Sequence, residues 1–236
     1  MLAGLPLPVT YRVDGGDVLL DGRIPWASNL IPPFLVVTAA ADAERPERSI
    51  VVAFDETLDG VAVAPHPPLL ALGATGSSTI GLSGVRVTRS AVLSEDVHAF
   101  VRGVLPRFLL LQSAFCKGLA ERSLEEAAQA LGDLGAGIRP QLEHIVDTAA
   151  EESERLVGLA RLATGIGADI PTSDLLAIRL RWSELAREAV HLELAAVGGR
   201  GYLASGPTAR RVREAAFLPV QAPTEVLLRW LLSRSA

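Results

Sequence analysis

The apolar pattern of the chain changes near residue 94, and this change limits its fold more than any other feature. From about residue 8 to residue 92, short apolar runs alternate with turns rich in glycine, proline and aspartate, a pattern typical of β-strands. After Ser94, apolar residues recur every three or four positions, which predicts amphipathic helices. The sequence therefore predicts a β domain over residues 1–93 and a helical domain over residues 94–236.

The first half contains at least six candidate strands. Val9–Val13 and Val18–Leu20 flank an Asp-Gly-Gly-Asp turn, which predicts a β-hairpin. The further candidates are Leu35–Ala39, Ile50–Phe54, Val61–Val63 and Gly84–Val87. Short strands separated by glycine and proline predict an antiparallel barrel or sandwich.

The second half predicts three long helices and two short ones. Thr172 or Ser173 is a candidate N-cap of the third helix, and Gly198 is a candidate stop. The predicted ranges are 106–131, 140–163, 173–197, 208–217 and 223–233. Such helices predict an antiparallel bundle, so the expected fold class is α+β.

Composition excludes several classes of function. A net charge of −5 provides no basic footprint for nucleic acid. No uninterrupted apolar run approaches the roughly 20 residues of a membrane span, and the most apolar stretch, Leu105–Leu111, is interpreted as a buried helix. The first residues show no basic leader, and the single cysteine, Cys116, suits a reducing compartment. We therefore expect a cytoplasmic protein.

A metal site is not predicted. Glu188 and His191 have the spacing of a di-iron bundle helix, but such a site needs a second copy of the motif and further glutamates. The other histidines, His66, His98 and His144, have no matching partner motif.

Four stretches of the sequence resemble one flavoprotein family. They are Leu-Asp-Gly-Arg-Ile-Pro-Trp-Ala-Ser-Asn at 20–29, Leu-Gly-Ala-Thr-Gly-Ser-Ser-Thr at 72–79, Gly-Gly-Arg-Gly-Tyr at 198–202, and the segment 213–224. In this order, they resemble the middle β domain and the C-terminal helical domain of the acyl-CoA dehydrogenase superfamily. The helical domain that begins the family's chains has no counterpart before Met1.

The resemblance implies an FAD-binding oxidoreductase. Trp26 would pack on the flavin ring, Ser28 would bond near flavin N5, and Asn29 belongs to the same stretch. The implied cofactor-binding residues of the helical half are Gly198, Gly199, Gly201, Tyr202 and Thr224. The resemblance also implies a homodimer or homotetramer with an acyl thioester as a possible substrate.

The catalytic glutamate of the family is missing. Ala222 occupies its position, and a methyl group cannot accept the α-proton of an acyl thioester. Some members place the base in the first bundle helix, but residues 107–109 here contain no carboxylate. We therefore assign no catalytic residue. Three functions remain open: an FAD-binding oxidoreductase or a component of one, a non-catalytic subunit of a complete acyl-CoA dehydrogenase-like chain, and a flavin-dependent monooxygenase.

Overall fold

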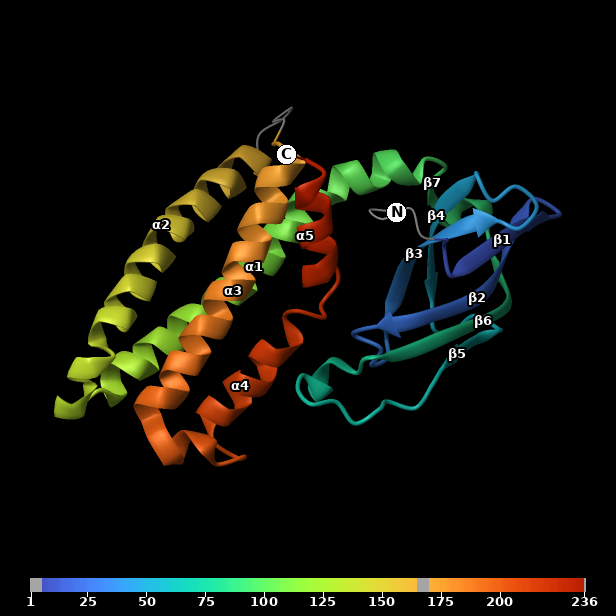
Figure 1. Cartoon of the computed structure of the whole chain (residues 1–236). Coiled ribbons are helices and arrows are strands. Elements are labelled where there is room, and N and C mark those ends of the chain that lie inside the picture. The colour runs from blue at the N-terminus through green and yellow to red at the C-terminus, as the bar shows by residue number, and fades with distance from the viewer. Residues whose placement is uncertain (1–5, 165–169, 236) are drawn as a thin grey trace. The chain divides into compact units, whose positions relative to one another are not determined.

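The structure is a computed structural model that describes residues 6–164 and 170–235. The chain divides into two compact units, Met1–Gly103 and Val104–Ala236, the first containing the sheet and the second most of the helical residues (Figure 1). The predicted α+β class is confirmed.

The described residues of the first unit form one seven-stranded sheet. Its strands are β1 (Val9–Asp14), β2 (Asp17–Ala27), β3 (Leu35–Asp42), β4 (Ser49–Asp55), β5 (Val61–Val63), β6 (Ser78–Val87) and β7 (Val92–Ser94). They lie in the order β5-β6-β2-β1-β3-β4-β7. Neighbouring strands are antiparallel except β1 and β3, which are parallel.

The predicted hairpin is confirmed. Strands β1 and β2 pair in register from Val9 opposite Gly22 to Asp14 opposite Asp17. Gly15 and Gly16 form the two-residue turn with φ values of 60° and 95°. A tight turn with two positive φ angles matches the right-handed twist of the strands, and glycine adopts it without steric cost.

The predicted closed barrel or sandwich is wrong, because the strands form one open sheet. The sheet is open, because its edge strands β5 and β7 do not pair with each other. Each edge strand has only three residues, and short edges limit unwanted pairing with other chains. One face still buries an apolar core, made by Val9, Val18, Leu20, Val36, Ile50, Val52, Phe54, Ile80, Leu82, Val85 and Val87 among others.

The five predicted helices are present. They are α1 (Val97–Ala130), α2 (Arg139–Thr164), α3 (Thr172–Val197), α4 (Pro207–Phe217) and α5 (Glu225–Ser233). Helix α1 begins at Val97 rather than at residue 106, because Asp96 accepts a hydrogen bond from Ala99 N at 2.8 Å and satisfies the first turn. Pro106, expected at the helix start, lies inside the helix.

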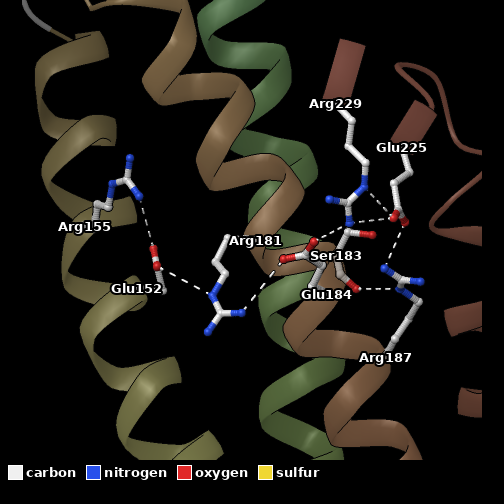
Figure 2. A network of polar contacts seen from close by, with 8 residues as sticks. All are labelled: Glu152, Arg155, Arg181, Ser183, Glu184, Arg187, Glu225 and Arg229. Carbon is white, nitrogen blue, oxygen red and sulfur yellow. Dashed lines mark hydrogen bonds and ion pairs between the residues drawn. The ribbon is translucent and has the colours of Figure 1, made fainter. Parts of the chain in front are cut away.

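Helices α2 and α3 are antiparallel and lie side by side (Figure 1). Arg155 of α2 pairs with Asp174 near the start of α3, whereas the earlier Glu152 pairs with the later Arg181. Figure 2 shows these contacts continuing to α5, where Glu225 contacts Arg187 of α3 and Arg229 contacts Glu184. The core of the bundle includes Leu109, Leu124, Leu142, Ile145, Leu175, Trp182, Leu185 and Leu228.

Helix α1 is unusually apolar. Among the described residues it is the one helix long and apolar enough to cross a membrane by length and composition. Only 28% of its most apolar 18-residue window is buried. Leu109 and Leu110 are buried as predicted, but Val104, Phe108, Leu111 and Phe115 are 44–71% exposed. Their spacing places these four side chains on one face of the helix.

A buried ion pair joins α3 to α4. Arg211 donates from Nε to Glu193 Oε2 at 2.7 Å and from Nη2 to Oε1 at 2.5 Å. The two side chains are 4% and 0% exposed. Burial opposes the charge of Glu193, but its hydrogen bonds, Arg211 first among them, outweigh burial and lower its pKa.

Removing one partner of this pair is expected to destabilise the helical unit. Glu193→Ala leaves the Arg211 cation buried without its counter-charge, and such a loss costs about 3 kcal/mol. The control Glu125→Ala removes an exposed pair with Arg122 and costs less than about 1 kcal/mol. Urea unfolding followed by helical circular dichroism measures both, and equal losses would contradict the prediction.

The same pair predicts how stability depends on pH. Because the folded-state pKa of Glu193 is lowered, its stabilisation is present above the unfolded pKa of about 4.3. It is lost as pH falls through the folded value. The urea midpoint of the parent chain should therefore fall more steeply below pH 4 than that of Glu193→Ala.

Candidate functional site

The pairing of β2 with β6 assembles the candidate site in the first unit. Ile24 lies opposite Ile80 and Ala27 opposite Ser78, with an irregularity in register between them. The chain leaves β2 at residue 27, beside the loop that enters β6. Asn29 N then donates to Thr75 O at 2.7 Å. Two segments far apart in sequence, 26–29 and 72–79, are thereby held together.

The backbone at this site is constrained. Asn29 and Leu72 have φ values of 63° and 60°, and they are the non-glycine residues with positive φ in the described parts of the chain. Asparagine tolerates this conformation, but leucine rarely adopts it. Gly76 also has positive φ, and a Cβ there would lie 2.8 Å from Ile31 Cγ1. Backbone strain of this kind is found preferentially at functional sites.

Trp26 is the dominant side chain of the site. Its indole is 68% exposed, although a tryptophan in a strand usually contributes to a core. Ser28 lies two residues further along, and its Oγ is 2.8 Å from Ser77 Oγ. Ser77 Oγ is in turn 2.7 Å from Thr75 Oγ1. An exposed flat aromatic surface beside hydroxyl groups suits a planar ligand with a polar edge.

A cavity of about 440 Å³ is lined in part by Leu30, the residue after Asn29. Its wall is mainly apolar, with Glu56 and His66 as its ionisable residues. Glu56 is engaged, because Phe34 N donates to its Oε2 at 3.0 Å. The apolar lining consists of Leu30, Pro32, Phe34, Val61, Val63, Ala64 and Pro65. A second cavity of about 490 Å³ in the same unit has a charged wall that includes Asp42, Arg48 and Glu95.

In the second unit, the Gly-Gly-Arg-Gly-Tyr segment ends α3 and forms a short 3₁₀ helix, η4 (Gly198–Tyr202). Gly198 has φ 66° and donates its N–H to Leu194 O. Gly201 is buried, and a Cβ there would lie 3.1 Å from Thr208 Cγ2. Gly199 is exposed, and Tyr202 is 84% exposed. Gly201 thus allows close packing within the unit and Gly198 allows the positive φ that ends α3, whereas a Cβ at Gly199 would meet no neighbour. The tyrosine ring faces outward.

Ala222, which the sequence resemblance aligned with the catalytic base, lies in the loop before α5. Its carbonyl accepts a hydrogen bond from Gln112 Nε2 at 2.8 Å. Buried Arg179 donates to Gln112 Oε1 and to Gln221 Oε1, both at 3.0 Å. Thr224 caps α5 by accepting from Leu227 N at 3.3 Å. The loop is therefore fixed by neutral acceptors around a guanidinium.

No free carboxylate stands next to Ala222 in the part of the chain that the structure describes. Glu225, the nearest in sequence, lies 2.9 Å from both Arg187 and Arg229 (Figure 2). Burial lowers the pKa of Arg179, while the charges of Cys116 and Glu225 act in the opposite direction. Arg179 Nη1 is buried with no hydrogen-bond partner among the described residues. The arrangement offers no general base.

The structure brings some predicted residues together and separates others. Ser28 and Asn29 form one cluster with Thr75 and Ser77. Trp26 lies two residues before Ser28 on β2, with its indole exposed. In the helical unit, Glu225, the residue after Thr224, pairs with Arg187 of α3. Arg187 lies about 16 Å before Gly198 along the α3 axis. Within this unit, the start of α5 therefore packs near Arg187, and the glycine turn follows at the end of α3.

Sequence reasoning missed Ser77, Thr75 and the Gln112–Arg179 pair. The 72–79 stretch had been recognised, but a glycine-rich loop does not show which hydroxyl meets which partner. Gln112 and Arg179 are 67 residues apart, so only the packed bundle joins them. No group of three or more His, Cys, Asp or Glu able to hold a metal occurs among the described residues.

Comparison with known proteins identifies the fold. No protein-family model and no curated protein sequence matches the chain. Solved structures do match: an acyl-CoA dehydrogenase from Geobacillus kaustophilus has a TM-score of 0.88 at 16% identity over 97% of this chain. Acyl-CoA dehydrogenase complexed with FAD from Bacillus anthracis gives 0.80 at 15% identity over 96%. KijD3 in complex with FMN and a dTDP-sugar gives 0.84 at 20% identity over 97%.

These matches confirm the resemblance at the level of fold: nearly the whole chain has an acyl-CoA dehydrogenase-like architecture. The chain spans 64%, 44% and 62% of the three matched chains, respectively.

Cys116 is expected to be chemically inert in the folded protein. The thiol is fully buried on α1, and burial raises its pKa to about 11 despite the nearby Arg179 charge. The thiolate, which is the nucleophile, is therefore scarce at pH 8. Iodoacetamide at pH 8 should leave the native protein unmodified by mass spectrometry and modify it fully in urea. Equal labelling rates in the two states would show that Cys116 is accessible and reactive.

Proposed function

We propose that this chain is a flavin-binding oxidoreductase component of acyl-CoA dehydrogenase-like fold. The observation that carries the proposal is the exposed Trp26 indole beside the Ser28–Ser77–Thr75 hydroxyls. Two of the matched structures support it, since one holds FAD and another FMN. FAD is our first choice of cofactor, as in the family that the sequence resembles.

The residues of the first unit fit a flavin. Trp26 provides a wall for a flat tricyclic ring. Ser28 would provide a hydroxyl at the polar edge of such a ring, and the bonds of Ser28 to Ser77 and of Asn29 N to Thr75 O hold this segment in place. When bound, a flavin would supply the electron and hydride chemistry that no side chain supplies. In the helical unit, Gly198, Gly199, Gly201, Tyr202 and Thr224 remain proposed cofactor-binding residues.

The proposal does not include α-proton abstraction by a carboxylate at position 222. The Ala222 side chain cannot act as a base, and Glu225 is already paired with two arginines. A flavin enzyme that activates oxygen needs no such base, and KijD3 binds a sugar nucleotide. An oxygen-using reaction is therefore our second candidate for an active enzyme.

A partner chain is part of the proposal. The exposed apolar face of α1, made by Val104, Phe108, Leu111 and Phe115, has the character of a surface that associates with protein. A homodimer, a homotetramer or a complex with a complete acyl-CoA dehydrogenase-like chain would cover it. In the last case the chain could serve as a non-catalytic subunit. Size-exclusion mass of the purified chain, alone and mixed with candidate partners, distinguishes these assemblies.

Loss of the Trp26 indole is expected to weaken flavin binding. Trp26→Leu should raise the Kd for FAD or FMN about tenfold or more, the usual value of one aromatic stacking contact. Trp230→Leu is the matched control, because Trp230 is also exposed but lies on α5. Flavin absorbance and tryptophan quenching in a titration measure Kd. A colourless parent protein that binds neither flavin would refute the proposed function.

Restoring a carboxylate at position 222 is not expected to create an acyl-CoA dehydrogenase. Ala222→Glu would place the new side chain in a loop whose neighbours are Gln112, Arg179 and Gln221. The chain also spans only 64% of the Geobacillus enzyme. Dye reduction with a series of acyl-CoA thioesters should remain at background for parent and variant. Turnover by the variant alone would show that the base was the missing element.

A further inference from the structure

The hydroxyl groups beside Trp26 form a chain whose direction is fixed. Thr75 Oγ1 lies 2.7 Å from Leu72 O, and a carbonyl oxygen can only accept, so Thr75 donates its one proton there. Ser77 must then donate to Thr75 across their 2.7 Å contact. Ser28 must in turn donate to Ser77 across 2.8 Å. Every proton of the chain therefore points away from the free side of Ser28.

The neighbouring hydroxyls point inward as well. Ser78 Oγ donates to Ala64 O at 2.8 Å and Thr79 Oγ1 donates to Pro25 O at 2.8 Å. Each of these protons is held by a backbone carbonyl. Neither proton is free to donate to Ser28, so neither can reverse the direction of the hydrogen bonds in the hydroxyl chain. On its open side, Ser28 therefore presents only oxygen lone pairs.

We propose that this hydroxyl chain makes the Trp26 site select the reduced form of a flavin. The inference rests on the proposed flavin site and adds the roles of Ser77 and Thr75, which position the Ser28 hydroxyl. Oxidised flavin carries acceptors at its reducible ring nitrogens, whereas the two-electron-reduced ring carries an N–H at N5. A lone pair that meets an N–H gains a hydrogen bond, whereas a lone pair that meets an acceptor leaves both groups unsatisfied.

The selection has an electrochemical consequence. Tighter binding of the reduced ring raises the reduction potential of bound flavin above that of free flavin. For a two-electron couple, a tenfold difference in Kd corresponds to about 30 mV. The site would thus hold reduced flavin for a following oxidation step and release the oxidised ring more readily.

The test compares the two redox forms of one ligand. Dialysed protein is titrated with oxidised FMN in air and with dithionite-reduced FMN under argon, and the titrations are repeated with FAD. We expect reduced flavin to bind about tenfold more tightly, and spectroelectrochemistry should show the matching rise in potential. Ser77→Ala frees the Ser28 proton to point outward, and the ratio of the two Kd values should fall to near one.

Two further variants serve as a control and as a second test. Ser90→Ala is the matched control, since Ser90 Oγ bonds Thr88 Oγ1 outside the hydroxyl chain in the same unit, and it should keep the parent ratio. Ser28→Ala removes the outward lone pairs and should also bring the ratio near one, which serves if Ser77→Ala fails to fold by circular dichroism.

The outcomes separate this inference from the proposed function. Binding of both redox forms with equal Kd, or tighter binding of oxidised flavin, overturns the inference and leaves the flavin site standing. A parent-like ratio in folded Ser77→Ala also overturns it. Binding of neither form overturns the flavin site and the inference with it.

Discussion

The pairing of β2 with β6 is the contact on which the candidate site depends. It brings Ser28 to Ser77, 49 residues later in the chain, and it sets the direction in which the chain leaves each strand. The irregularity between Ile24 and Ala27 lies beside Trp26, and bulges commonly redirect side chains next to functional sites. The exposed indole lies beside this irregularity, and Asn29 and Leu72, with positive φ, lie in the segments that leave β2 and lead to β6.

The helical unit uses its buried charges for structure. Arg211 and Glu193 satisfy each other where α3 meets α4. Arg179 instead donates from Nε and Nη2 to two glutamine side chains, Gln112 and Gln221, and so holds the loop that carries Ala222. A guanidinium only donates hydrogen bonds, so Arg179 cannot act as a base. The loop is well ordered by this network, but the network contains no group that could replace a catalytic glutamate.

Local pattern determined which parts of the fold could be predicted. Turn chemistry at Gly15 and Gly16 and the helical periodicity after Ser94 identified the hairpin and all five helices. Strand β7 was missed; it has only three residues. The early start of α1 was also missed, since Asp96 caps the helix through one local hydrogen bond. The open edges, like the contacts of Ser77 and Arg179, depend on residues distant in sequence. A single sequence shows which residue types are present but not which distant residues contact one another.

Among the described residues of the helical unit, no free carboxylate stands beside Ala222. The proposed function therefore relies on the chemistry that a bound flavin would supply. A stacking wall with an acceptor-only hydroxyl stabilises the electron-rich form of such a cofactor, because that form carries the additional N–H. The fold is shared with acyl-CoA dehydrogenases, but function depends on the residues of the site. We therefore propose electron donation by a reduced flavin rather than acyl-CoA oxidation as the role of this chain.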